Sequence, residues 1–294
     1  MSRTFYVNGE FVAEQDATVS VLDRGFLFGD AVYEVSSVLD GRLIDNTNHM
    51  IRLRRSLSEL SMDSPASDAE IVAAQEELIT RNNLREGLVY LQVSRGAADR
   101  DFGFPQQTKP TLVMFTQEKN LLASPKAETG LSIITVPDIR WKRRDIKTVG
   151  LLAPVLGKQA AAEAGVDDAW MVEDGFITEG TSNNAYIVSH DGVIHTRQLG
   201  NEILSGITRA AVQKLSEACQ IRVVEKPFTV EQALQAKEAF ITSASMFVMP
   251  VVSIDGQSIG DAKPGELTMR LREMYIDIAR EHCEFSTVEA AVTA

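Results

Sequence analysis

Three tight two-residue turns, each standing between strand-like segments, restrict the fold of this sequence more than any other feature. The turns are Asn8-Gly9, Asp40-Gly41 and Asp191-Gly192. Dipeptides of this kind suit the positive φ angles of hairpin turns. Antiparallel pairing is therefore expected near both ends of the chain. The flanking strands are predicted at 4–7 with 10–13, 31–39 with 42–44, and 185–188 with 193–195.

Helices and further strands are predicted between these hairpins. Apolar residues at helical spacing predict helices that begin at Asn46 or Thr47 and at Ser67 or Asp68, because these residues are good helix caps. Three more helices are expected: one after Lys147, with Pro154 in its first turn and its end near Gly165, and two at 206–219 and 264–280. Strands at 111–115 and 131–136 are expected to close a first half, with a polar link at 116–130. Two domains are predicted, residues 1–120 and 121–294, with a loose tail at 284–294.

The composition excludes several classes of function. A net charge of −12, spread along the chain, argues against a nucleic-acid or anionic-membrane partner. No apolar run approaches the roughly 18 residues of a membrane span, and no apolar leader is visible, so a cytoplasmic protein is expected. Two cysteines and four scattered histidines show no metal-ligand spacing, so no metal site is predicted. Cys219 is expected to be a buried, inert thiol at the end of a helix.

Lys147 stands where a basic segment meets an apolar one. Arg140, Lys142, Arg143 and Arg144 precede it, and the run 151–156 that follows is expected to be a buried helix. Lost hydration and cationic neighbours both favour a neutral amine, which is a nucleophile able to form a Schiff base. The alternative interpretation, a surface lysine in a basic loop, stays open from these residues alone.

Two short segments and an arginine could bind a phosphate. The helix start at Gly206-Ile207-Thr208 offers backbone N–H groups and a hydroxyl, and Thr242–Ser245 could form a second anion cup. Arg52 could make a forked contact to the same group. Each of these is equally an ordinary cap, turn or surface residue. Glu179, expected in a tight turn, is either a surface carboxylate or a partner for a protonated ring nitrogen.

A reactive lysine, a phosphate cup and such a carboxylate are together what a protein supplies to pyridoxal 5′-phosphate (PLP). The sequence resembles, over nearly its whole length, the fold type IV PLP-dependent aminotransferases and, within them, the D-amino acid aminotransferases. The motifs that carry the resemblance are Asp23-Arg24-Gly25, Phe28-Gly29-Asp30, Val32-Tyr33-Glu34-Val35, His49 with Arg52-Leu53, Ile139-Arg140-Trp141, Asp145-Ile146-Lys147, Thr178-Glu179-Gly180, Gly206-Ile207-Thr208-Arg209, Thr242-Ser243 and Pro250-Val251.

The resemblance implies an α/β (α+β) fold with a small N-terminal α/β domain and a larger, barrel-like C-terminal domain with flanking helices. It also implies a homodimer, with the cofactor between the domains. Lys147 is expected to hold PLP and to move the proton between substrate and cofactor, Glu179 to pair with the ring nitrogen, and Leu204 to pack on the ring. The phosphate is expected to bind Arg52, Ile207, Thr208, Ser243 and Ala244.

Substrate residues are implied in the same way. Tyr33 and Arg100 match the α-carboxylate clamp of D-amino acid aminotransferases, and Phe28 and Val35 are expected beside the substrate. Phe102 stands where that clamp has a histidine, which removes one donor, and Ser37 replaces a lysine often found on the strand. Arg95 and Arg143 are alternative sources of the missing donor.

The expected activity is transfer of an amino group from a D-amino acid, such as D-alanine, to a 2-oxo acid such as 2-oxoglutarate. Small amino donors and 2-oxo acids are the expected partners. Three alternatives share the fold: an (R)-selective amine transaminase, a branched-chain L-amino acid transaminase and an aminodeoxychorismate lyase. The loop from Arg100 to Phe102 does not match the tyrosine and arginine arrangement of the branched-chain subfamily. A cofactor-binding relative without turnover is a fifth interpretation, from a different class.

Overall fold

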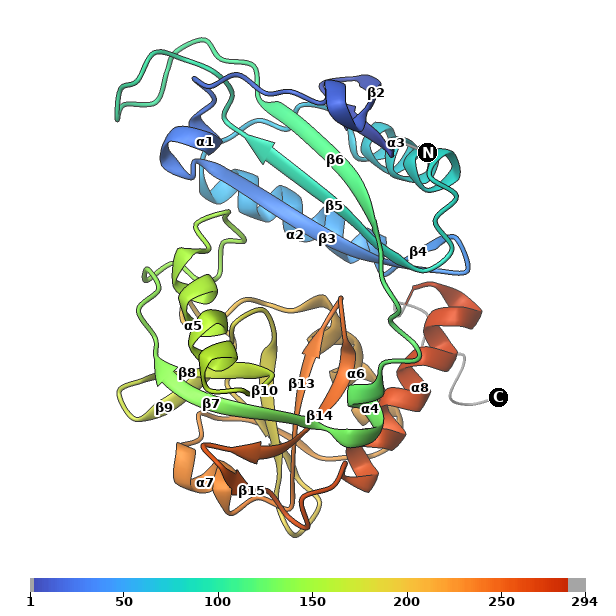
Figure 1. The fold of residues 1–294 in the computed structure, drawn as a ribbon, viewed down its shortest axis with the longest axis vertical. Coiled ribbons are helices and arrows are strands. Elements are labelled where there is room, and N and C mark those ends of the chain that lie inside the picture. Colours follow the sequence, from blue (N-terminus) through green and yellow to red (C-terminus); the bar gives the residue numbers. More distant parts are fainter. Residues whose placement is uncertain (1–2, 285–294) are drawn as a thin grey trace. The chain divides into compact units, whose positions relative to one another are not determined.

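The computed structural model of the chain describes residues 3–284. The chain forms two compact units (Figure 1). The first contains the described residues up to Asn120 together with Ile146–Gly150, and the second contains Leu121–Asp145 and the described residues from Leu151 onward. The tail expected after residue 284 lies outside the described residues.

The first unit is built on an antiparallel sheet of six strands. Asn8 and Gly9 both have positive φ angles, of 49° and 100°, and they join β1 to β2 as the sequence predicts. The second predicted hairpin also forms, around Asp40 and Gly41. The strands follow the order β2-β1-β6-β5-β3-β4. Their bounds are Thr4–Val7 (β1), Glu10–Ala13 (β2), Ala31–Leu39 (β3), Arg42–Ile44 (β4), Gly87–Ser94 (β5) and Thr111–Glu118 (β6).

Two long helices, α2 (Asn46–Glu59) and α3 (Asp68–Arg81), cover one face of this sheet (Figure 1). Ser67 caps α3 as predicted, through a capping box with Glu70. The predicted cap of α2 is wrong by one residue, because Asp45, with a left-handed φ of 54°, precedes the helix. Apolar side chains of both helices pack against β3, β5 and β6, and these contacts form the core of the unit.

Two short helical segments of the first unit have no clear apolar period and were not predicted. The turn-rich stretch before β3 contains α1 (Arg24–Phe28), which Asp23 caps by accepting a hydrogen bond from Gly25 N at 2.8 Å. Gly29, with φ 68°, ends it. A single 3₁₀ turn, η1 (Glu14–Asp16), follows β2.

The second unit contains a mixed sheet of nine described strands, ordered β12-β11-β10-β13-β14-β7-β8-β9 with β15 paired to β14. The pairs β11–β12, β14–β7 and β7–β8 are parallel. The sheet curls, so β9 at one end contacts β10. The bounds are Leu131–Pro137 (β7), Asp168–Glu173 (β8), Phe176–Gly180 (β9), Asn184–Val188 (β10), Ile194–Thr196 (β11), Val223–Glu225 (β12), Glu238–Ser243 (β13), Phe247–Ile254 (β14) and Gln257–Ser258 (β15).

The strand predicted at 131–136 forms, but its expected place in the first half is wrong. As β7 it joins the second sheet through two parallel pairings, with β14 and β8. Parallel partners are distant in sequence and leave no turn signal between them. The hairpin of β10 and β11 around Gly192 is confirmed.

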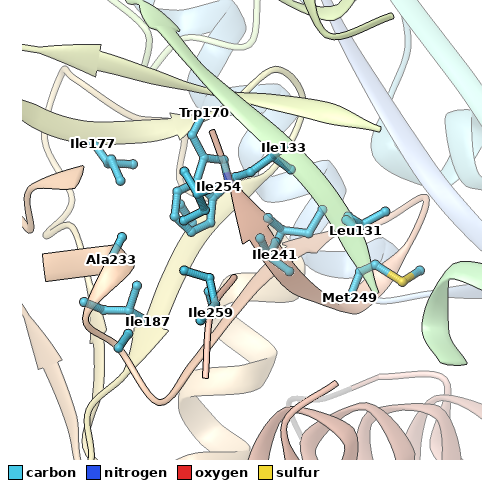
Figure 2. Packing of buried hydrophobic residues seen from close by; sticks show 14 of the residues in the cluster. Leu131, Ile133, Trp170, Ile177, Ile187, Ala233, Ile241, Met249, Ile254 and Ile259 are labelled. Atoms are coloured by element: carbon cyan, nitrogen blue, oxygen red, sulfur yellow. The ribbon is translucent and has the colours of Figure 1, made fainter. Parts of the chain in front are cut away.

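One buried apolar cluster of the second unit lies on one face of the curled sheet. Trp170, which is fully buried, packs among Ile133, Ile177 and Ile254, and Figure 2 shows the cluster continuing to Leu131, Met249 and Ile259. Phe228 meets the Trp170 ring edge-on, with centroids 6.1 Å apart. An aromatic residue of this size accounts for a large share of the apolar area that such a core buries.

Five described helices accompany this sheet. The helix after Lys147, α5, was expected to be buried, and that prediction is wrong: Leu152, Val155 and Leu156 are exposed, and only Gly157 and Ala161 are buried. Cys219, expected to be buried, is half-buried just after α6. No helix of the described chain is long and apolar enough to span a membrane. The bounds are Pro125–Thr129 (α4), Leu152–Glu163 (α5), Ile207–Ala218 (α6), Val230–Leu234 (α7) and Glu266–His282 (α8).

Candidate active site

Lys147 is held against the edge of β3 by backbone pairing. Lys147 O accepts from Tyr33 N at 3.0 Å, and Val149 N donates to Ala31 O at 3.1 Å. This antiparallel bridge places Lys147 opposite Tyr33, so the two side chains share one face of the sheet. The Lys147 Nζ lies 4.1 Å from the centroid of the Tyr33 ring. The amine is therefore fixed beside an aromatic face by the fold of the first unit.

The basic segment before Lys147 is neutralised by carboxylates. Arg140 pairs with Asp138 and Glu179, Lys142 and Arg144 pair with Glu173, and Arg143 pairs with Asp145. Lys147 differs from all four, because it makes no ion pair among residues 3–284. The cationic neighbours expected from the sequence thus have partners of their own, and the lysine is distinguished by lacking one.

Arg52 is buried on the sheet side of α2, where it makes a forked contact with Glu34 of β3. Its Nε donates to Glu34 Oε1 at 2.8 Å and its Nη2 to Oε2 at 2.7 Å, and His49 Nδ1 lies 2.7 Å from Oε2. Burial raises the pKa of Glu34, but the Arg52 charge and both hydrogen-bond partners outweigh it and lower that pKa to about 2. Burial lowers the pKa of His49, so the neutral ring donates Nδ1–H to the carboxylate.

Glu34 and His49 belong to the motifs quoted above, but no role was predicted for either residue. A signal existed for both. His49, Arg52 and Ser56 recur at helical spacing on the side of α2 that also carries the buried Met50 and Leu53. Polar residues on a buried helix face need partners, and Glu34 alternates with Tyr33 so that it faces the helix.

The expected substrate residues of the first unit fall into two groups. Tyr33 and Val35 are half-buried on one face of β3, beside Lys147 in the case of Tyr33. Arg100, Phe28 and Phe102 form the other group: the Arg100 guanidinium lies 5.3 Å from the Phe28 ring centroid and 5.5 Å from that of Phe102. No hydrogen bond or ring contact joins the two groups within the described chain.

The two arginines named as alternative donors are both paired with carboxylates. Arg95 donates to both oxygens of Asp30 at 2.7 and 3.1 Å and to the carbonyl of Leu60 at 2.8 Å. Arg95 would therefore lose these partners if it supplied the donor that Phe102 lacks. Arg143, the other alternative, donates to both oxygens of Asp145 at 3.0 and 3.1 Å. Arg100 has no ion pair within the described chain.

Glu179 lies in strand β9 of the second unit and is buried; the turn position and the surface interpretation are both wrong. Its Oε1 pairs with Arg140. Its Oε2 accepts from Asn184 Nδ2 at 2.9 Å, and Leu204 N donates to both oxygens at 3.1–3.2 Å. Burial raises the pKa of Glu179, the Arg140 charge opposes the rise only in part, and Asp138 adds to it.

Asp138 takes the larger share of Arg140. The Arg140 Nε and Nη2 donate to the two oxygens of Asp138 at 3.0 and 2.7 Å, which leaves Nη1 for Glu179. Glu179 is therefore a buried carboxylate with less than one full cationic partner. Such a group favours a further positive charge or a proton donor, which is what a protonated pyridine nitrogen supplies.

The expected phosphate residues of the second unit lie close to this carboxylate. The amides of Ile207 and Thr208 precede the first backbone hydrogen bond of α6, from Ala210 N to Gly206 O. Thr208 is buried, and Ser243 Oγ is a buried atom without a hydrogen-bond partner among the described residues. Ala244 follows Ser243 in the turn after β13. The amides of Ile207 and Thr208 and the unsatisfied hydroxyl of Ser243 fit the oxygens of a phosphate.

The expected cofactor residues are thus distributed over both units. Lys147, Arg52 and Tyr33 belong to the first unit, and Glu179 belongs to the second. Leu204, Ile207, Thr208, Ser243 and Ala244 are also in the second. Within each unit the fold brings its own members together from distant parts of the sequence. The described residues contain no cluster of side chains suited to a metal ion.

A mixed α/β chain with one antiparallel and one curled sheet, and with a lysine held beside a tyrosine, matches enzymes of known structure. The T.th. branched-chain aminotransferase, solved with pyridoxamine 5′-phosphate, superposes with a TM-score of 0.86 at 26% identity, covering 94% of each chain. The model of the family Amino-transferase class IV matches residues 31–254. The chain belongs to this family, and the predicted fold class is confirmed.

Two curated relatives give finer comparisons. The D-alanine aminotransferase of Staphylococcus aureus (strain MSSA476) is 37% identical over 278 residues, covering 94% of this chain and 98% of the relative. The D-alanine aminotransferase of Bacillus licheniformis is 40% identical over 270 residues, covering 90% and 93%. The chain is therefore an enzyme of the aminotransferase type, as the sequence predicted.

Proposed function

We propose that this chain transfers amino groups from D-amino acids, such as D-alanine, to 2-oxo acids such as 2-oxoglutarate, with PLP as cofactor. The names of relatives that are 37% and 40% identical over most of the chain support this substrate class. The structural observation that carries the proposal is Lys147: each cation of the segment before it is paired with a carboxylate, whereas its own amine faces the Tyr33 ring.

The chain's own residues divide the work. When bound, PLP supplies an electron sink for the bond that is broken at the substrate Cα. Lys147 Nζ would supply the amine that holds the cofactor and, once released from it, would accept the proton of the substrate Cα. Glu179, short of positive charge, would hold the proton of the ring nitrogen. Leu204, whose backbone N–H donates to Glu179, would pack against the ring.

The phosphate is assigned to donors of both kinds. Ile207 and Thr208 offer amides, Thr208 and Ser243 offer hydroxyls, and Ala244 offers a turn amide. Arg52 adds a positive charge whose orientation is set by its forked contact with Glu34. Charge-assisted contacts of this type hold a dianion more strongly than neutral donors do.

Substrate choice is assigned to the remaining predicted residues. The Tyr33 hydroxyl and the Arg100 guanidinium bind the α-carboxylate. Phe28 and Phe102 flank Arg100, and their ring faces leave its in-plane N–H donors available for a ligand. Val35, which shares the Tyr33 face of β3, bounds the space for the substrate side chain.

A panel of D-amino acids, L-amino acids and (R)-amines tests the proposal. Each donor is mixed with the PLP-loaded enzyme, and conversion of the bound aldehyde form to the amine form is followed by absorbance. We expect D-alanine and other D-amino acids to convert the cofactor fastest. Conversion by L-leucine or L-valine in preference to any D-amino acid would contradict the D-amino acid assignment while leaving the transaminase assignment intact.

One observation favours a second candidate, an (R)-selective amine transaminase. Phe102, 79% exposed, stands where the resemblance places a histidine that donates to the substrate α-carboxylate. Part of the expected clamp is therefore apolar. An apolar wall tolerates a donor that has no carboxylate better than a histidine does. In the same panel, faster conversion by an (R)-arylalkylamine than by D-alanine would support this candidate.

We further propose that the working enzyme is a homodimer, as its resemblance to the family implies. Light scattering after size exclusion measures this directly, and a mass near the 32.3 kDa of one chain would contradict it. Twice that mass at micromolar concentration is the expected result.

A further inference from the structure

Asn184, the first residue of β10, has no role in the assignments above, yet it contacts several of the residues that do. Its side-chain Nδ2 donates to Glu179 Oε2 at 2.9 Å and to the carbonyl of Leu204 at 3.0 Å. Both partners are acceptors, so the amide nitrogen, and not its oxygen, must point toward them. Asn184 is also buried, 4% exposed, so this orientation is fixed by packing as well as by hydrogen bonds.

The other side of the Asn184 amide lies against the start of α6. A Cβ added to Gly206 would come within 2.2 Å of Asn184 Oδ1, a distance that no side-chain carbon tolerates. The backbone of Asn184 pairs with Thr242, the residue before Ser243. One asparagine therefore adjoins the carboxylate assigned to the ring nitrogen and both segments assigned to the phosphate.

We infer that Asn184 is a positioning residue that fixes the Glu179 carboxylate relative to the phosphate-binding start of α6. The inference rests on the proposed function, because it concerns how the cofactor residues of the second unit are positioned relative to one another. With Asn184 in place, Glu179 keeps one oxygen for Arg140 and the other for the amide. The carboxylate is thereby held in one orientation although it shares its arginine with Asp138.

The expected effect of losing the amide follows from the hydrogen bond itself. A hydrogen bond to a charged group contributes about 1.5–3 kcal/mol, which corresponds to roughly 10- to 100-fold in binding. Asn184→Leu keeps the branched shape of the side chain but has no donor. The charged form of Glu179 then becomes more costly in its buried site, and the ring nitrogen is less often protonated.

Two readouts that do not depend on turnover test the inference. The first is the Kd of PLP for the full-length protein after removal of bound cofactor. The second is the pH midpoint of the visible absorbance of bound PLP. For Asn184→Leu we expect the Kd to rise 10- to 100-fold. We expect the midpoint to move up by about one pH unit, because loss of the ring proton removes a positive charge near the nitrogen of Lys147.

Asn183 provides a matched control. It is the neighbouring residue, it is also buried, and its Nδ2 also donates to a carboxylate, that of Asp168 at 2.8 Å. Asn183→Leu removes an equivalent hydrogen bond that does not involve Glu179. We expect it to lower the melting temperature while leaving the PLP Kd and the absorbance midpoint unchanged.

Gly206 gives an independent arm. Gly206→Ala should displace the Asn184 amide and weaken PLP binding at least tenfold, and the same change in an Asn184→Ala background should have a much smaller effect because the obstructing oxygen is gone. This cycle also serves if Asn184→Leu does not fold. Equal effects of Gly206→Ala in both backgrounds contradict the inference.

The outcomes separate the inference from the proposal beneath it. If the wild-type protein takes up no PLP, the proposed function fails and the inference with it. If the wild type binds PLP but Asn184→Leu, stable or destabilised, keeps the wild-type Kd and midpoint, only the inference is overturned.

Discussion

Two buried glutamates, one in each unit, are each paired with an arginine. They differ in whether that arginine is shared with a second carboxylate. Glu34 receives both forks of Arg52 and a further hydrogen bond from His49, and its pKa is lowered to about 2. Glu179 receives one nitrogen of Arg140, whose other side is taken by Asp138, and its pKa is raised. Burial penalises both carboxylates, so the partners decide the sign.

The difference indicates different tasks. A carboxylate that receives both forks of an arginine remains ionised at neutral pH. It also orients that arginine for another group, as Glu34 orients Arg52. A carboxylate that shares its arginine is still short of positive charge and can accept another cation. The second condition is what a site for a protonated ring nitrogen requires, and Glu179 meets it.

Removing the charge of Glu34 should give the largest change in stability. Glu34→Gln leaves the buried Arg52 guanidinium without its counter-charge, which is expected to cost about 3–5 kcal/mol in the free energy of unfolding. Urea denaturation at pH 7 measures it. A loss below about 1 kcal/mol would show that the buried Arg52 charge does not depend on Glu34.

Removing the charge of Glu179 should affect activity more than stability. Glu179→Gln is isosteric and leaves Arg140 bound to Asp138, so the free energy of unfolding should change by no more than about 1 kcal/mol. Transamination of D-alanine should fall about 100-fold or more, because the charge that holds the ring proton is gone. If stability falls as far as in Glu34→Gln while the rate is retained, the two glutamates do not differ in the proposed way.

Acid should separate the two sites as well. Because the pKa of Glu34 is lowered from 4.5 to about 2, its contribution is present above pH 4.5 and is lost as the pH falls through 2. The wild type should therefore lose about 2 kcal/mol more than Glu34→Gln between pH 6 and pH 3. Urea denaturation of both proteins at the two pH values provides the comparison. Parallel losses would assign the acid sensitivity to other carboxylates.

The smallest expected effect tests the cause of the difference. Asp138→Asn removes the competing charge, so Arg140 should turn more fully toward Glu179 and lower the pKa of Glu179. Carbon NMR of labelled glutamate carboxyls, with Glu179→Gln to assign the signal, measures this pKa in the cofactor-free protein. An unchanged value would mean that burial alone sets it.

Local signals in the sequence predicted the hairpins and the long helices well. Asn8-Gly9 and Asp40-Gly41 carry their turn geometry in their own residue types, and Ser67 with Glu70 carries a capping box. The parallel pairings of β7 could not be read in this way, since no short segment encodes a partner far along the chain. The apolar composition of α5 predicted a buried helix, yet the helix is exposed, because burial depends on what packs against it.

The family and its motifs could be predicted from ordered matches along the chain, whereas the surroundings of each site residue could not. Nothing in the sequence indicates that Arg140 pairs with both Asp138 and Glu179, or that the Asn184 side chain donates to the Leu204 carbonyl. These contacts join residues whose spacing in sequence carries no period. They arise from the curl of the second sheet, which brings β9 beside β10.

The central claim is that Lys147 carries the cofactor, and reduction with borohydride followed by peptide mass mapping tests it most directly. Lys142, exposed in the same segment, serves as the internal control. We predict a yellow protein in which the reduced pyridoxyl mass is found on the peptide at Lys147 and not at Lys142. A colourless protein, or an adduct on any other lysine, would contradict the account.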